Sequence, residues 1–304
     1  MTEAVARDAR VPGRVWAVLV VGLTVLGASA ILIRLAGVEG ETDFRALVVW
    51  RLLFTVAILA PVGLRRGPRE EIAALGRRDL ALVAAAGALL AFHFLGWFSS
   101  LAFTSVASAT VLVTMSPIFI AILGAVFLRE SPRRWTWIAI ATGVAGAALI
   151  SLGDARGGVF PQAALGNALA FGAALCIAVY LLVGRAVRQR VSFGAYFFPV
   201  NVVVLLVVVA VAVAGGVSLA LDGPTIALCL VMAVGPGLLG HGAFAYSVKY
   251  IPAATLGLLS LCEPVVSALL ALVIFEEVPG AVALVGMAVV LASIAAVLWQ
   301  SRRG

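Results

Sequence analysis

Two stretches of the chain decide its fold: SVASATVLVTMSPIFIAILGAVFLRESP at residues 105–132 and PAATLGLLSLCEPVVSALLALVIFEEVP at residues 252–279. They align without a gap, 147 positions apart in a chain of 304 residues. Two prolines and one glutamate recur in register: Pro117 with Pro264, Glu130 with Glu277, and Pro132 with Pro279. Because both residue types are rare in so apolar a chain, these matches indicate an internal duplication. The repeated unit is therefore about half of the protein.

The composition is that of a membrane protein. Hydrophobic residues make up 63% of the chain and charged residues only 12%, whereas roughly a quarter of a soluble domain is charged. Apolar stretches of span length recur along the whole sequence. They lie at about 15–36, 45–64, 80–102, 105–128, 135–152, 162–184, 193–215, 225–248, 252–275 and 281–300. We therefore expect an all-α integral membrane protein with ten transmembrane helices.

The charges of the loops predict the orientation. If the N-terminus is inside, nearly all of the 21 basic residues fall in cytoplasmic segments, and the outer loops hold only Arg45 and Arg156. Such a bias is the positive-inside rule. It predicts a multi-pass protein of the cytoplasmic (inner) membrane with both termini cytoplasmic. It also explains the net charge of +7 without nucleic acid as a partner; the lipid bilayer is the expected surrounding.

The repeat and the span count together predict an inverted architecture. Residues 15–152 form a first five-helix repeat and residues 162–300 a second. Because five is odd, the second repeat enters the membrane upside down. Inverted repeats of this kind are typical of secondary transporters, whose substrate sites lie near the midplane between the halves.

These features resemble the drug/metabolite transporter superfamily, in its EamA-type branch. The resemblance rests on Pro117 followed by Glu130, on Glu263-Pro264 followed by Glu277, on VVWRLLF at Arg51 and on the first-helix ending GASAILIRLAG. It implies a central cavity between the two inverted repeats, with the fifth and tenth helices at the periphery. It also implies export or facilitated movement of small metabolites, amino acids among them.

Two charges break the symmetry of the repeats and are the main candidates for substrate binding. Glu263 lies at the centre of the ninth helix, on one face with Ser260, and its counterpart in the first half is Ser116. Arg51 lies in the second helix, and the matching region near Asn201 has no charge. An ionisable residue inside a membrane indicates a functional site. We expect Arg51 to receive an acidic group and Glu263 a cationic group or a proton, as suits a zwitterion. The alternatives are an ion pair or snorkelling for Arg51, and a neutral or backbone-bonded carboxyl for Glu263.

Other polar and aromatic residues could line the same cavity. His93 and His241 fall at nearly symmetric positions and suit proton handling, although a histidine with a structural role is the alternative. Trp97 and Tyr246 are candidate lining residues or interfacial anchors. No cluster of metal ligands accompanies them, so we expect neither a metal nor another cofactor.

The repeated prolines and glutamates have two interpretations each. Pro117 and Pro264 lie near the middle of the fourth and ninth helices, where a proline removes a hydrogen bond and kinks the helix. They are either hinges beside the cavity or static kinks. We expect Glu130 and Glu277 to stabilise the start of the next helix, where a carboxylate is favourable; gating is the alternative.

The sequence favours a transporter or facilitator over other classes. The chain contains no HExxH, GxSxG or phosphate-binding motif, so we do not expect an enzyme. A membrane-embedded enzyme or a sensor with an intramembrane polar site stays the alternative. Small residues recur every four positions in the fifth and tenth helices, at Ala139, Gly143 and Ala147 and at Ala288, Ala292 and Ala296. Such faces allow close helix packing, either within a repeat or in a homodimer.

Overall fold

The computed structural model describes residues 11–36, 43–104, 106–130, 132–153, 161–276 and 278–301. Within these ranges every regular element is a helix, and no strand is found there. The first half contains α1 (Gly13–Gly27), α2 (Ser29–Leu35), α3 (Phe44–Gly63), α4 (Arg66–Ala73), α5 (Arg77–Phe103), α6 (Val106–Val113), α7 (Ser116–Leu123), the π-helix η1 (Gly124–Leu128) and α8 (Arg134–Gly153).

The second half repeats this order with small differences. It contains α9 (Ala163–Arg188), α10 (Phe193–Ala214), α11 (Gly223–Met232), the π-helix η2 (Ala233–His241), α12 (Gly242–Ser247), α13 (Ala253–Ser260), α14 (Cys262–Phe275) and α15 (Ala281–Ser301). Among the described residues, nine helical stretches are long and apolar enough to cross a membrane. A shorter apolar stretch, Arg134–Ile150 of α8, would be the tenth. The chain is thus an all-helical, multi-pass membrane protein, while ten as the number of spans stays a prediction.

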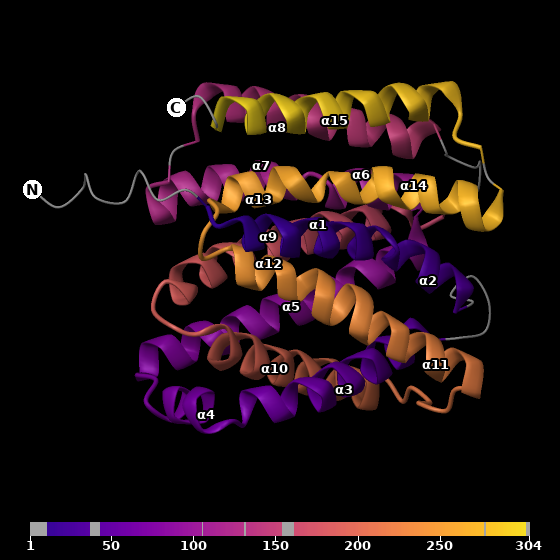
Figure 1. The fold of residues 1–304 in the computed structure, drawn as a ribbon. Helices are drawn as coiled ribbons and strands as arrows, with labels where there is room; N and C mark the ends of the chain where they lie inside the picture. The colour runs from indigo at the N-terminus through magenta and orange to yellow at the C-terminus, as the bar shows by residue number, and fades with distance from the viewer. Residues whose placement is uncertain are drawn as a thin grey trace, which may run out of the picture.

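The two halves run in opposite directions. In Figure 1, α1 runs from left to right and α9, its counterpart, from right to left. The packing partners are exchanged in the same way, because α5 of the first half packs on α9 and η2 of the second half packs on α1. The pair of α3 and α10 and the pair of α8 and α15 form opposite edges of the bundle (Figure 1). We call the end at which α1 begins and α15 ends, on the left of Figure 1, the inner end.

The duplicated stretch is visible in the backbone as well as in the sequence. A break separates α6 from α7 just before Pro117, and another separates α13 from α14 just before Pro264. Both prolines therefore lie in the first turn of a new helix, where a missing N–H costs least. Each of these paths ends on a left-handed residue, Arg129 with φ 55° and Glu276 with φ 57°. These residues are also 147 positions apart.

Several local features differ from the expected elements. The first predicted helix is interrupted at Ala28, and the basic loop between the second and third helices contains the short helix α4. Neither π-helix was predicted. Insertions of this type change the helical register locally and are frequent at functional sites.

The small face of α8 packs inside the chain. Ala139 and Ala147 are buried, and a Cβ added to Gly143 would lie 2.7 Å from the Leu261 side chain. Next to this face, a Cβ added to Gly146 would lie 2.9 Å from the carbonyl oxygen of Gly286, so the backbones of α8 and α15 touch. Thr142 Oγ1 lies 2.9 Å from Ser293 Oγ across the same pair of helices. The alanine face of α15 is exposed instead, at Ala288, Ala292 and Ala296. A homodimer through that face stays a prediction.

Candidate functional site

Arg51 is a buried cation on the central part of α3. Its residue is only 4% exposed, and its guanidinium carbon lies 4.6 Å from the centre of the Phe94 ring. Its Nε atom has no hydrogen-bond partner in the part of the chain that the structure describes. A central arginine costs about 2.5–3.5 kcal/mol to place in a membrane, whereas a cation–π contact returns about 0.5–2 kcal/mol. The side chain therefore retains donor capacity for another group.

Phe94 on α5 joins Arg51 to both histidines. The ring of His241 meets Phe94 edge to face at 5.1 Å, and the ring of His93 lies 5.5 Å from it. His93 Nδ1 lies 3.0 Å from the carbonyl oxygen of Ala173 on α9. Since a carbonyl only accepts, Nδ1 must donate, and Nε2 of a neutral His93 is then an acceptor. The two symmetric histidines thus meet at one aromatic ring.

The π-helix η2 makes room for the arginine. A Cβ added to Gly237 would lie 3.1 Å from Thr55 Oγ1 and 3.8 Å from Arg51 Nε. The absent side chain therefore lets α3 approach the η2 backbone beside the guanidinium. Pro236 lies inside the same π-helix and supplies no N–H. Neither this segment nor Phe94 was predicted from the sequence, although Gly235-Pro236-Gly237 within an apolar helix indicates an irregular backbone.

Glu263 occupies the first turn of α14, directly after the break at Leu261. Its residue is partly exposed, and its carboxylate makes no hydrogen bond or ion pair within the described ranges. Ser260, one turn before it, donates to the carbonyl oxygen of Gly257 at 2.7 Å. Helix α1 lies close by, because a Cβ added to Gly27 would be 3.2 Å from the Glu263 carbonyl oxygen. A partly exposed carboxylate next to a helix break remains available for a cation or a proton.

The two asymmetric charges are not directly paired. Helix α1 packs against both α14 and η2, and α3 packs on η2 (Figure 1). Arg51 lies on α3 and Glu263 on α14, and no ion pair joins them in the described part of the chain. The direct ion pair considered for Arg51 is thus not formed with Glu263 in this conformation.

The other candidate residues lie in two places. Trp97 is one turn beyond His93 on α5 and is partly buried. Tyr246 lies near the inner end, 6.2 Å from the ring of Phe193 and 5.4 Å from that of Tyr250. The structure therefore groups Arg51, His93 and His241, and it places Tyr246 in a separate aromatic cluster. No group of three or more potential metal ligands occurs among the described residues.

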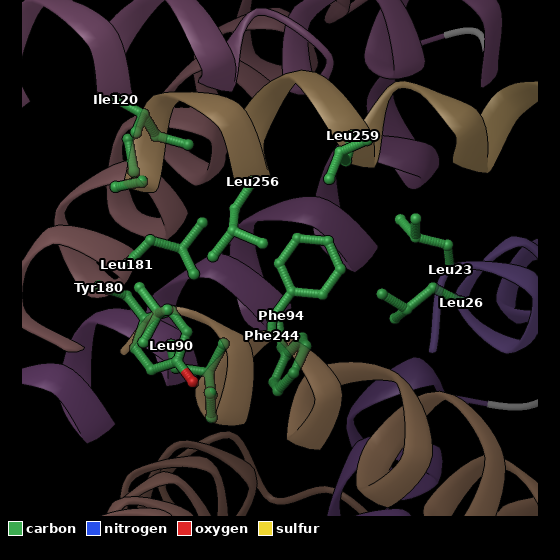
Figure 2. Close-up of a cluster of buried hydrophobic side chains, with 14 of the residues drawn as sticks. Leu23, Leu26, Leu90, Phe94, Ile120, Tyr180, Leu181, Phe244, Leu256 and Leu259 are labelled. Atoms are coloured by element: carbon green, nitrogen blue, oxygen red, sulfur yellow. The ribbon is translucent and has the colours of Figure 1, made fainter. Parts of the chain in front are cut away.

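An apolar cluster closes the space between the halves in this conformation. Figure 2 shows that its side chains converge from α1, α5, α7, α9, α12 and α13. The side chains labelled there are Leu23, Leu26, Leu90, Phe94, Ile120, Tyr180, Leu181, Phe244, Leu256 and Leu259. Phe94 belongs to this cluster and also carries Arg51 on its face. A change at Arg51 therefore acts directly on the residues that fill the centre of the bundle.

The model of the EamA-like transporter family matches this chain twice, over residues 14–152 and residues 164–299. The chain belongs to the EamA-like transporter family. This confirms the resemblance to EamA-type drug/metabolite transporters, and it identifies the chain as a membrane transporter. The two matches fall on the two inverted halves.

Solved structures support the fold of this EamA-like transporter. A crystal structure titled "Crystal structure of protein" superimposes with a TM-score of 0.79 at 19% identity, covering 96% of this chain and 98% of that chain. At this identity the likeness shows the fold alone. No curated protein matches the chain closely enough to count as a relative.

For a transporter, the contacts at the inner end matter because one end must open while the other is closed. Arg185, near the end of α9, forms an ion pair with Glu130 at 2.8 Å. Its Nη1 also donates to the carbonyl oxygens of Val248 and Lys249, each at 2.8 Å. We call these contacts the inner latch. They join Glu130 of the first half to α9 and to the turn between α12 and α13 of the second half.

The inner latch includes a glutamate that the sequence placed before the next helix. The Glu130 carboxylate accepts a hydrogen bond from Arg185, while its expected role in stabilising the start of α8 stays a prediction. A neighbouring arginine, Arg188, is buried and donates to the carbonyl oxygens of Ala245 and Val191. The Ala245 carbonyl belongs to the last turn of α12, where carbonyls lack partners within the helix. Glu277, the counterpart of Glu130, lies outside the described residues.

Proposed function

We propose that this EamA-like protein is a secondary transporter or facilitator that exports small polar metabolites carrying a carboxylate, such as amino acids, across the cytoplasmic membrane. The observation that supports the carboxylate is Arg51, a buried guanidinium with an unused donor. Arginine suits this task because its planar fork binds a carboxylate through two parallel hydrogen bonds. The nearby ring of His241 adds a donor, and no carboxylate of the described chain occupies the place of the ligand.

Glu263 would provide the second charge. We infer that it receives the amino group of the substrate or a coupling proton. Its exposure at a helix break supports this role, because transporters bind ligands where a spanning helix is interrupted near the midplane. Ser260 would contribute on the same face. Trp97 would contribute an aromatic wall near His93.

Movement between the halves would follow the two broken helices. We infer that the five-helix units at residues 15–152 and 162–300 rock against each other, with Pro117 and Pro264 as hinges. We infer that the inner end is closed in the described conformation, because the contacts of the inner latch and of the apolar cluster both join the two halves. If the inner end is cytoplasmic, as the loop charges predict, substrate is released outward from this state.

The experiment that tests the proposal is substrate profiling in proteoliposomes. The purified protein is reconstituted, and counterflow of a zwitterionic amino acid is measured with and without a pH gradient. We expect competition by free amino acids and much weaker competition by their methyl esters, which lack the carboxylate. Equal competition by esters and acids would contradict the role of Arg51, and transport of amines alone would contradict the proposed substrate class.

A further inference from the structure

A basic hollow lies outside the proposed transport path, beside α4 at the inner end. Leu64, Arg66, Arg69 and Glu70 line this open hollow. Arg66 Nε pairs with Glu70 Oε1 at 2.9 Å on the exposed face of α4. Arg69, and Arg65 just before the helix, make no ion pair within the described ranges. The three arginines therefore exceed Glu70, the carboxylate that lines the hollow, by two positive charges.

Helix α4 is held in place by its other face. Ile72 packs against the hydrophobic core, and the Glu71 carboxylate accepts a hydrogen bond from the backbone N–H of Ser192 at 2.7 Å. A Cβ added to Gly194 would lie 3.2 Å from Pro68, so α4 also sits close to the start of α10. These contacts fix the arginines on a rigid support and leave their guanidinium groups outward.

An apolar track leads from the hollow along the outer surface of α3. Ile58, Val62 and Leu64 are 41%, 39% and 58% exposed, and they lie on the last turns of a membrane span and just beyond it. A ligand that fills both regions needs a negative headgroup and an apolar tail. Anionic lipids have this chemistry, and basic residues next to a span attract them.

We propose that this hollow binds an anionic phospholipid. The phosphodiester lies between Arg66 and Arg69, with Arg65 nearby, and one acyl chain follows Leu64, Val62 and Ile58 towards the membrane centre. Glu70 orients Arg66 without cancelling the charge of the group. The site takes a lipid and not free phosphate, because a free anion leaves the apolar track uncovered.

The test uses the full chain in detergent and native mass spectrometry with added phosphatidylglycerol or phosphatidylcholine. We expect retention of phosphatidylglycerol by the wild type. The double variant Arg66→Gln/Arg69→Gln should weaken retention roughly 30-fold. This factor corresponds to about 2 kcal/mol, the attraction to anionic lipid that two arginines near the membrane surface supply. The matched control is Arg133→Gln/Arg134→Gln, which removes two charges at the inner end near the start of α8, on the opposite edge of the bundle (Figure 1). It should retain phosphatidylglycerol like the wild type.

Two further arms separate the site from general attraction. Leu64→Glu adds a charge to the apolar track and should also weaken phosphatidylglycerol retention, while inorganic phosphate at millimolar concentration should not displace the lipid. Equal losses in the two double variants would overturn the proposal, as would equal retention of phosphatidylcholine or displacement by phosphate. All variants alter exposed side chains, and size-exclusion chromatography verifies that each protein is folded before the measurement.

Discussion

After the break between α6 and α7 the chain continues with Ser116 and Pro117, and after the break between α13 and α14 it continues with Glu263 and Pro264. The backbone is similar at both places and each path ends on a left-handed residue, although only the first path contains a π-helix, η1. The side chains differ: Ser116 is buried, whereas Glu263 brings a carboxyl group and is partly exposed. The duplicated prolines therefore maintain a common scaffold. Chemistry specific to this transporter is to be sought where the halves differ.

The second helix of each repeat shows the same contrast. Arg51 of α3 keeps an unused donor beside Phe94, whereas Asn201 of α10 is buried and donates to the carbonyl oxygen of Phe197 at 2.8 Å. Asn201 is satisfied within its own helix, so it needs no ligand. The Nε–H of Arg51 has no such partner in the described chain. A substitution of Arg51 therefore tests for a ligand more directly than a substitution of Asn201.

The largest effect is expected at Arg51. Arg51→Ala should lower transport on the order of 100-fold, because truncating one partner of a buried charge pair costs about 2–5 kcal/mol. Arg51→Lys should be nearly as damaging, since an ammonium cannot reproduce the planar fork. Uptake in proteoliposomes, normalised to folded protein, measures both.

Asn201→Ala is the matched control in the second repeat, and it should retain transport within a few-fold. A wild-type rate in Arg51→Ala would remove the proposed carboxylate site. If Arg51→Ala and Asn201→Ala fail to insert alike, both residues are structural, and the contrast between the repeats loses its functional meaning.

The second effect is expected at Glu263. Glu263→Ser copies the residue of the first repeat, and Glu263→Gln keeps the shape without the charge. Both should reduce transport about tenfold or more and abolish its pH dependence, because neither side chain can bind a proton or pair with an ammonium. Initial rates between pH 5 and pH 8 are the measurement. Ser116→Ala is the control, and full activity of Glu263→Gln over this range would contradict the role.

The sequence predicted the scaffold better than the site. Hydropathy and the repeat predicted nearly all of the helices and the interruptions at Pro117 and Pro264, because both signals are local. The contact between Arg185 and Glu130 spans 55 positions, and no local rule pairs them. Phe94 was missed because one phenylalanine in an apolar helix is not distinctive. Its role comes from packing, which brings α3, α5 and η2 together.

A third effect is expected at the inner latch, where the two repeats hold each other. Arg185→Gln removes the ion pair and the contacts to two carbonyls, so the inner end should open more often. In a background without Cys176, Cys229 and Cys262, a single cysteine at buried Leu256 should then react several-fold faster with a membrane-impermeant thiol reagent from the inner side. A coupling of 1–3 kcal/mol corresponds to about 5–150-fold, and partial exposure of the pair favours the low end.

Glu130→Gln sharpens this test, because it leaves the donation of Arg185 to the Val248 and Lys249 carbonyls intact. Its effect on labelling should be smaller than that of Arg185→Gln. Unchanged labelling in both variants would show that the apolar cluster alone keeps the inner end closed.

The smallest effect is expected at the N-caps of α3 and α10, the second long helix of each repeat. Asp43 caps α3 and accepts from the backbone N–H of Arg45 at 2.8 Å, whereas Ser192 caps α10 and accepts from Ala195 at 3.3 Å. The hydrogen bond from the Arg45 side chain lowers the pKa of Asp43 below its ordinary value of 3.8, with a further contribution from the Arg45 backbone. A carboxyl whose pKa is lower in the folded state stabilises that state above the ordinary pKa. The contribution is lost as pH falls through the folded-state pKa.

The first turn of α3 should therefore lose about 1 kcal/mol of protection against hydrogen exchange below about pH 4, which is the usual contribution of an N-cap. The first turn of α10 should not change, because a serine does not titrate in this range. Hydrogen exchange at the amides of Arg45 and Ala195, measured between pH 3 and pH 6 and corrected for the intrinsic rate, gives the comparison directly. Asp43→Ser copies the second repeat and should make α3 as insensitive to acid as α10. Equal acid sensitivity of the two turns in the wild type would mean that the bundle loosens as a whole, and that the cap carries no separate contribution.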